Sequence, residues 1–384
     1  MEQLRSRLRS IDCLRGGAAL AVVVHHALEL RSPPDGPWRR VLWFRAIWTV
    51  LHQGYLGVPL FFVISGFCIH LRCAQARARR QKPALAFGSF WKRRIHRLYP
   101  PYVAALCLSM SSIVVAVYLL KNPHAIADYP APHARWIGFD FVAHLFLLHG
   151  LIPKLDLAAG NPSFWTLARE EYLYLLYFFV FAWRAKWGIY RALLLVLSIG
   201  ISFDLAFLIW PPSRPEVRST LASSAVVLWI QWCLGMLAVE AYYGVVRLPA
   251  YASKLYTAIL AGMIAKLAEL YLPLLAPALW GVTFFVLINW CVKRESEGRL
   301  SNSRAISWLA GVGVFSYSLY LVHFPLQRVA ASLLRPSQTI PAYAAVCLLL
   351  VVASYYAGRI FFLIVEKRFL NAGADAINTA ISNR

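Results

Sequence analysis

The chain has 384 residues, of which 60% are hydrophobic and only 15% are charged, and its formal net charge is +22. This composition excludes an ordinary soluble domain, which is usually about 45–50% apolar and about a quarter charged. The lysines and arginines lie between long hydrophobic stretches, so their excess indicates membrane topology and contact with a lipid bilayer. We therefore expect no nucleic-acid partner.

Hydropathy and helix breakers predict an all-α integral membrane protein with about ten transmembrane helices. Each predicted segment is long enough to cross about 30 Å of hydrocarbon. We expect residues 1–370 to form one multi-span domain and 371–384 a short polar C-terminal tail, too short to bury a core. The predicted spans are 11–30, 54–72, 98–120, 164–184, 188–210, 220–244, 252–272, 274–292, 308–328 and 341–364.

One further apolar stretch, residues 137–152, is short and is interrupted by Asp140, His144 and His149. Its length predicts a re-entrant or interfacial segment rather than a full crossing. A full crossing would also place the basic loop 184–191 outside, against the positive-inside rule. The sequence thus predicts a multi-pass protein of the cell inner (plasma) membrane with both termini cytoplasmic.

The seven cysteines show no spacing typical of a metal site, and nearly all fall in apolar segments. They are expected to behave as small hydrophobic residues or free thiols. We therefore expect no metal.

The first predicted span carries two residues that are costly in lipid, Arg15 and His26. They are eleven residues apart, which on an α-helix places both on one face, about 16 Å from each other. A polar face inside a span normally looks into a bundle or a cavity. The alternative is that Arg15 extends to the cytoplasmic surface and His26 lies at the outer end without a catalytic role.

Five segments, taken in order, resemble the motifs of acyltransferase family 3, membrane O-acyltransferases acting on glycans. The first holds an arginine, ten residues and then a histidine, which sets Arg15 and His26 as that pair. Four positions depart from the family pattern: Cys13, His25, Arg169 and Tyr172. The five segments are 12–27, 61–67, 94–100, 164–172 and 316–323.

The resemblance implies transfer of an acyl group, most often acetyl, from cytoplasmic acyl-CoA to a hydroxyl of a glycan or lipid-linked sugar. Acetyl-CoA, or another acyl-CoA, is then a donor substrate, and no bound cofactor is expected. Arg15, Arg94 and Arg97 would bind the donor, since the planar guanidinium suits phosphate. The alternative is an ordinary positive-inside cluster.

The resemblance assigns the catalytic roles to His26, Glu170 and His323. A neutral His26 could take the proton of the attacking hydroxyl, or it could carry the acyl group covalently. Glu170 could orient His26 or bind the acceptor, although a carboxylate at a helix N-terminus is also favourable in itself. His323 could equally be a hydrogen-bonded packing residue.

Other polar and aromatic residues have less specific signals. Trp165 and Tyr317 could stack on a sugar ring, although interfacial aromatic belts have the same composition. The three polar residues of 137–152 could line an acceptor vestibule.

Two other functions fit the same composition. A transporter for a sugar or lipid-linked substrate would need no acyl chemistry, but it would predict paired repeats with broken helices, and no repeat is visible. The second alternative is a subunit that only passes acyl groups to a separate periplasmic transferase.

Overall fold

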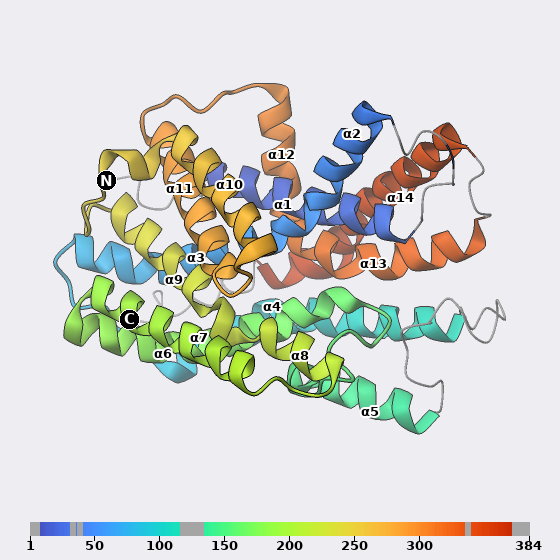
Figure 1. The fold of residues 1–384 in the computed structure, drawn as a ribbon, viewed down its shortest axis with the longest axis horizontal. Helices are drawn as coiled ribbons and strands as arrows, with labels where there is room; N and C mark the ends of the chain where they lie inside the picture. Colours follow the sequence, from blue (N-terminus) through green and yellow to red (C-terminus); the bar gives the residue numbers. More distant parts are fainter. Residues whose placement is uncertain (1–7, 31–35, 37–40, 116–133, 335–338, 371–384) are drawn as a thin grey trace. The chain divides into compact units, whose positions relative to one another are not determined.

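The computed structural model describes residues 8–30, 36, 41–115, 134–334 and 339–370, and helices are the only regular secondary structure within them (Figure 1). The predicted polar tail, 371–384, and the end of the predicted span 98–120 lie outside the described residues. The chain divides into two compact units, each assembled from three separate segments. The first unit comprises 1–18, 57–85 and 168–314, and the second 19–56, 86–167 and 315–384.

The described helices confirm a multi-pass membrane architecture. Six helical stretches are long and apolar enough to cross a membrane, or seven if α12 (Arg304–Val314) and α13 (Ser316–Leu333) count as one interrupted span. The six stretches are α1 (Arg9–Glu29), Leu42–Ala78, α7 (Ile189–Ile209), Pro215–Tyr242, α11 (Ala276–Ser296) and Ile340–Leu370.

The predicted count of ten spans is not confirmed. Three of the other predicted spans do form helices, but within the described residues these lack the required apolar length. Charged residues near the start of α4 and α6 account for two of these differences, and α10 is only 17 residues long. These helices are α4 (Phe87–Val114), α6 (Trp165–Trp187) and α10 (Leu255–Tyr271).

The short polar stretch forms α5 (Ala134–Leu145) and a 3-10 turn, η6 (Leu148–Leu151). Leu147 between them adopts a left-handed conformation with φ of +56°, which ends the helix. Twelve residues of α-helix extend about 18 Å, well short of the hydrocarbon core. As described, α5 is therefore too short to span, and its re-entrant or interfacial location stays a prediction.

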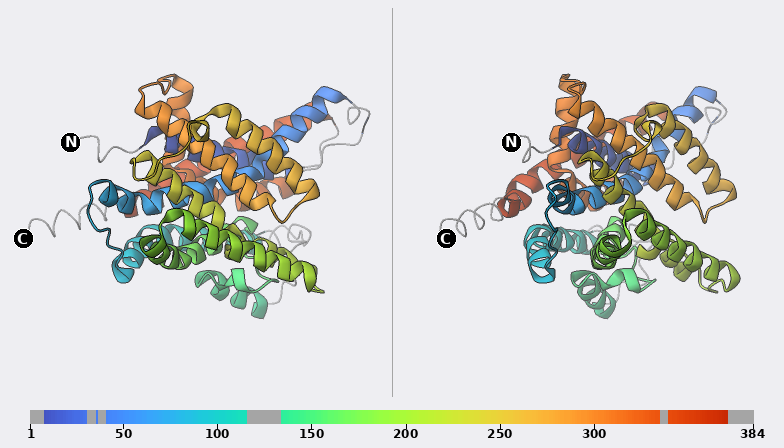
Figure 2. Two further views of the ribbon diagram at one scale, coloured as in Figure 1. Left: turned by 60° about the vertical axis from the view of Figure 1, so that its left-hand side comes forward. Right: turned by 90° about the vertical axis from the view of Figure 1, so that its left-hand side faces the viewer.

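The first unit is built around the pairing of α3 (Gly57–Ala78) with α9 (Ala225–Tyr242). Gly66 makes their close approach possible, since a Cβ there would lie 1.9 Å from the carbonyl oxygen of Trp232. Helix α11 packs on both, and α10 runs beside α11 in Figures 1 and 2. The unit also contains α7, α8 (Pro215–Ala222), η8 (Ala250–Ser253) and α12.

A buried ionic network joins three helices of this unit. Glu240 of α9 is fully buried, and its carboxylate accepts hydrogen bonds from Nε of Arg184 at 2.8 Å and from a terminal guanidinium nitrogen at 2.9 Å. Nε2 of His70, on α3, lies 3.0 Å from the same carboxylate. Buried charges persist only when they are paired in this way.

The second unit centres on α13, which packs along α14 (Ile340–Phe361) and against α4 (Figure 1). Its apolar core includes Leu106 and Phe164, both fully buried. The remaining elements are the second half of α1, α2 (Leu42–His52), η3 (Gln53–Leu56), α5, η6, η7 (Pro162–Phe164), the start of α6, and η9 (Phe362–Glu366).

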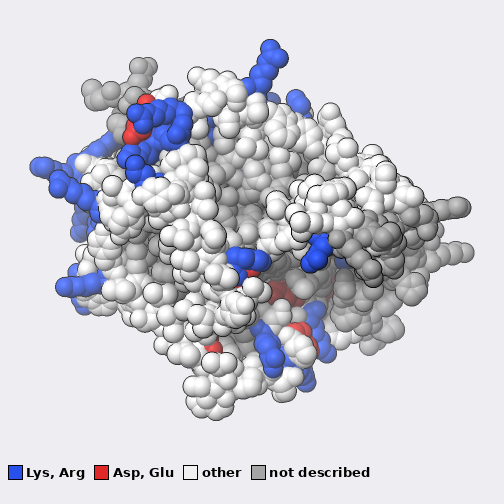
Figure 3. Space-filling view, turned by 45° about the horizontal axis from the view of Figure 1, so that its top comes forward, with Lys and Arg blue, Asp and Glu red and all other residues white. Residues whose placement is uncertain are grey.

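Large apolar side chains cover much of the exposed surface. On α14 they recur every four residues, where Leu348, Val352, Tyr356 and Ile360 are 43–64% exposed. Figure 3 shows a face on which most residues carry no charge. Such stripes are unfavourable in water and favourable in lipid, so they agree with the spanning helices.

Candidate active site

The two motif histidines meet in the second unit. His26 lies on the part of α1 that belongs to this unit, and His323 lies on α13. Nδ1 of His26 is 2.9 Å from Nε2 of His323, and the two rings stack with an interplanar angle of 16°. His323 is fully buried whereas His26 is half-buried, so His26 is the more accessible member of the pair.

The partners of His323 set the protonation of both rings. Nδ1 of His323 faces the carbonyl oxygens of Tyr320 at 2.8 Å and Leu319 at 3.2 Å. A carbonyl oxygen only accepts, so this nitrogen carries the hydrogen and leaves a lone pair on Nε2 when the ring is neutral. That lone pair accepts the Nδ1 hydrogen of His26. The neutral His26 therefore presents its own lone pair at Nε2.

A buried glutamine, Gln327, links α13 to both α1 and α14. The side-chain amide of Gln327, one turn after His323, donates to the carbonyl oxygen of Val23 on α1 and to the hydroxyl of Ser354 on α14, both at 3.1 Å. Gln327 is fully buried, so losing these bonds would leave polar groups unsatisfied. It thereby positions α13 against the turn of α1 that precedes His26.

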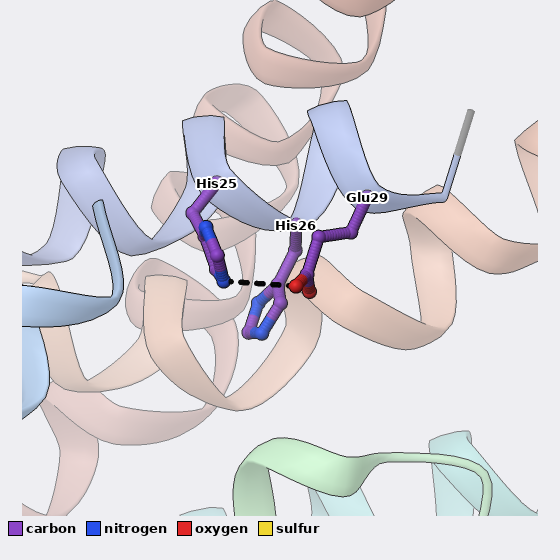
Figure 4. Close-up of side chains that lie close together, drawn as sticks. All are labelled: His25, His26 and Glu29. Atoms are coloured by element: carbon purple, nitrogen blue, oxygen red, sulfur yellow. Dashed lines mark ion pairs between the residues drawn. The ribbon is translucent and has the colours of Figure 1, made fainter. Parts of the chain in front are cut away.

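Two further polar side chains share the turn of His26. Figure 4 shows His25, His26 and Glu29 projecting from one side of α1, with an ion pair between His25 and Glu29. Gly54 lets η3 approach this turn, since a Cβ there would lie 2.0 Å from the carbonyl oxygen of Ala21. That approach keeps His25 buried.

The predicted catalytic carboxylate lies in the first unit. Glu170 of α6 accepts a hydrogen bond from the hydroxyl of Ser65 at 2.6 Å and another from the hydroxyl of Tyr174. Ser65 in turn accepts from the indole nitrogen of Trp232 at 3.2 Å. These three residues hold the half-buried carboxylate in one orientation, with the close packing at Gly66 bringing Ser65 next to α9.

Arg169, the additional cation beside Glu170, has a structural role. Arg169 is 1% exposed, and its Nε donates to the carbonyl oxygen of Ser223 at 2.9 Å. A second guanidinium nitrogen lies 3.4 Å from the carbonyl oxygen of Thr220. Both carbonyls lie at the C-terminal end of α8, where a cation is favourable. This departure from the family pattern therefore anchors α8.

The three predicted donor-binding arginines fall on two helices. Arg94 and Arg97 are three residues apart near the start of α4, in the second unit, with Arg94 over the ring of Phe90 at 5.6 Å from its centroid. Arg97 is exposed and Arg94 is half-buried. Arg15 is half-buried on the part of α1 that belongs to the first unit. Donor binding by these three residues stays a prediction.

The polar residues of the short segment are buried, so they do not line an open vestibule. Asp140, His144 and His149 are all fully buried, and the two imidazoles stack with 3.8 Å between centroids. Asp140 accepts from the backbone N–H of Ala159 at 2.8 Å. We interpret the group as a polar core of this segment.

The hydroxyl of Tyr317 donates to the carbonyl oxygen of Leu98 at 3.0 Å. That bond ties α13 to α4, so the predicted sugar-stacking role of Tyr317 is not needed to explain its position. Sugar stacking by Trp165 stays a prediction.

Ser65, Tyr174 and Gln327 were not identified from the sequence. Two of them carried a visible signal, because Tyr174 follows Glu170 by four residues and Gln327 follows His323 by four, each on the same helix face. Ser65 lies within the motif segment 61–67, but its partners lie more than a hundred residues away in the chain, so the sequence did not indicate its role.

Comparison with known proteins adds to this geometry. A family model for an acyltransferase domain matches residues 8–359. The chain is 25% identical over 359 residues to a peptidoglycan O-acetyltransferase of Listeria monocytogenes, covering 87% of this chain and 51% of that protein. It is 25% identical over 341 residues to a putative peptidoglycan O-acetyltransferase of Bacillus subtilis, covering 82% and 48%.

An O-acetyltransferase of Staphylococcus aureus is 27% identical over 216 residues, covering 54% of this chain and 31% of that protein. The chain spans about half the length, or less, of these curated relatives. No solved structure matches the chain. Because one family model covers nearly all of its length, the chain belongs to acyltransferase family 3, enzymes that transfer acyl groups other than amino-acyl groups.

Proposed function

We propose that this protein is an inner-membrane O-acetyltransferase that moves an acetyl group from cytoplasmic acetyl-CoA to a hydroxyl of a cell-envelope glycan. Family membership supports acyl transfer, and the names of the relatives make peptidoglycan the first acceptor to test. The observation that carries the proposal is the hydrogen bond between His26 and His323, because it leaves a basic nitrogen on the more accessible ring.

In the proposed reaction, Nε2 of His26 takes the proton from the acceptor hydroxyl as its oxygen attacks the thioester carbonyl carbon. The new carbon–oxygen bond forms, the carbon–sulfur bond breaks, and the CoA thiolate leaves and takes the proton back from His26. His323 accepts the Nδ1 hydrogen throughout. The hydrogen bond strengthens when His26 is positively charged, which favours the transition state.

An acetyl-histidine intermediate on His26 would use the same lone pair. It predicts two half-reactions, with acetylated protein formed from acetyl-CoA when no acceptor is present. Incubation with radiolabelled donor alone distinguishes the two routes, since direct attack leaves the protein unlabelled.

We assign Glu170 to the acceptor, because Nδ1 of His26 already has His323 as its partner. A carboxylate held by Ser65 and Tyr174 is suited to accept a hydrogen bond from a sugar hydroxyl. Arg15, Arg94 and Arg97 are proposed to bind the CoA phosphates from the cytoplasmic side.

The test uses the purified full-length protein in nanodiscs with radiolabelled acetyl-CoA and peptidoglycan fragments. The wild type should label the glycan, and His26→Ala should lower the rate by about 10²- to 10⁴-fold, the usual contribution of a general base. Glu297→Gln, at an exposed residue outside all five motif segments, is the control and should keep its activity.

Transfer by His26→Ala at the wild-type rate would refute the assigned chemistry. Movement of the glycan across the membrane without any acyl donor would instead support a transporter.

A further inference from the structure

The turn of α1 that carries His26 also carries His25 and Glu29, two potential metal ligands that the proposed acyl transfer does not use. Nε2 of His25 lies 3.2 Å from a carboxylate oxygen of Glu29. One ligand atom from each of His25, His26 and Glu29 lies within 4.8 Å of the other two. Figure 4 shows the three side chains on the same side of the helix. All three belong to the second unit.

A second observation concerns the burial of His25. Its side chain is only 9% exposed, yet its Nδ1 has no hydrogen-bond partner among the described residues. The ring of His52 packs against it at 4.8 Å between centroids, and Nδ1 of His52 is likewise buried without a partner in that part of the chain. Buried nitrogens are normally satisfied. The proposed set uses the other nitrogen of His25, Nε2, which faces Glu29. Two imidazoles with one carboxylate are a known zinc ligand set.

The chemistry of the set indicates which ion it would take. Two imidazoles and a carboxylate are ligands that Zn²⁺ and neighbouring divalent transition metals prefer, whereas Ca²⁺ and Mg²⁺ need mostly oxygen. Ligand atoms around tetrahedral zinc are about 3.4 Å apart, given bonds of about 2.1 Å. Glu29 has a side chain that is 46% exposed and is therefore able to move the remaining distance and to admit an ion from water.

We propose that His25, His26 and Glu29 form a binding site for a divalent transition metal, with Zn²⁺ as its reference ion, and that its occupation stops acyl transfer. The inhibition rests on the proposed function, whereas the binding does not. Coordination through Nε2 of His26 would occupy the lone pair of the base. Coordination through Nδ1 would displace the hydrogen that His323 accepts. Either mode disables His26 while the metal is bound.

The binding test uses the full-length protein in detergent after treatment with EDTA. Co²⁺ is titrated and followed by its visible absorption, and Zn²⁺ is titrated by calorimetry. We expect one ion per chain, with Glu29→Gln and His25→Gln each weakening the affinity by at least about 100-fold, more than the usual loss of an outer-shell partner. Glu29 is exposed, so its substitution leaves the packing intact. His96→Gln should bind like the wild type.

Equal Zn²⁺ affinity in the wild type, Glu29→Gln and His25→Gln would overturn the site. Failure of the wild type to bind either ion would also overturn it.

The inhibition test compares each protein with and without Zn²⁺, relative to its own untreated rate. Acetyl transfer by the wild type should fall when the site is occupied and return with EDTA, whereas Glu29→Gln should need at least about 100-fold more Zn²⁺. Bound metal that leaves wild-type transfer unchanged would overturn the inhibition. A protein without transferase activity would contradict the proposed function, and the metal titrations would still decide the site.

Discussion

His323 offers the sharpest test of the proposed mechanism, because its predicted role is to orient and polarise His26 rather than to contact substrate. His323→Leu removes the acceptor for Nδ1–H of His26, whereas His323→Gln can keep an acceptor oxygen near the position of Nε2. His323 is fully buried, and neither leucine nor glutamine extends much further than histidine, so both replacements fit the site. Comparing the two variants therefore separates loss of the hydrogen bond from loss of the imidazole.

The expected magnitude follows from the hydrogen bond of 2.9 Å between the two rings. A hydrogen bond to a charged group contributes about 1.5–3 kcal/mol, which corresponds to about 10- to 150-fold in rate if it acts only in the transition state. Without an acceptor, His26 is also free to place its hydrogen on Nε2. A catalytic histidine held in the wrong tautomer has lost about 10⁴ in kcat in a serine protease.

We therefore expect His323→Leu to lose about 10²- to 10⁴-fold in kcat, with the KM for acetyl-CoA nearly unchanged. His323→Gln should recover most of that loss. Steady-state transfer assays at saturating donor and acceptor measure the effect, and thermal unfolding in detergent checks that both variants fold. Wild-type kcat in His323→Leu, or equal loss in both variants despite equal stability, would refute the orienting role.

Three further substitutions test the framework around the site. Glu240→Gln should lower the unfolding free energy by about 3–5 kcal/mol, because it leaves buried cations unpaired. Glu297→Gln, which removes an exposed ion pair, should lower it by less than about 1 kcal/mol. Equal unfolding midpoints of the two variants would contradict this expectation. Ser65→Ala, which removes a hydrogen bond to Glu170, should raise the KM for the glycan by about tenfold and leave the KM for the donor unchanged. An unchanged KM for the glycan would contradict a role of Glu170 in acceptor binding. Gly66→Ala should lower the unfolding temperature by several degrees by forcing α3 away from α9, whereas Gly88→Ala, with open space around it, should not.

Much of the architecture depends on local sequence and was therefore predictable. A helix satisfies its own backbone hydrogen bonds, so long apolar stretches in lipid must be helical whatever surrounds them. The short length of α5 followed from its composition in the same way. The motif residues His26, Glu170 and His323 were recognisable because their segments keep a fixed order and spacing along the chain.

The number of spans was not predictable with the same accuracy. Apolar length alone did not distinguish a full crossing from a helix that begins in charged residues. In α6 the internal charges are Arg169 and Glu170, and each is held by partners from other elements. A hydropathy average over neighbouring residues includes the unfavourable transfer of these charges into lipid, but not the hydrogen bonds that compensate for it.

The sequence by itself determined the helical class and the membrane setting, and it predicted which residues carry the acyl chemistry. Only the tertiary structure decided which of those residues lie together. His26 and His323 are 297 residues apart, and their contact depends on Gln327, which holds α13 against α1. Hydropathy and motif order are properties of neighbouring residues, whereas the tautomer of His26 is set by a lone pair from a distant helix, and only packing brings that lone pair within hydrogen-bonding distance.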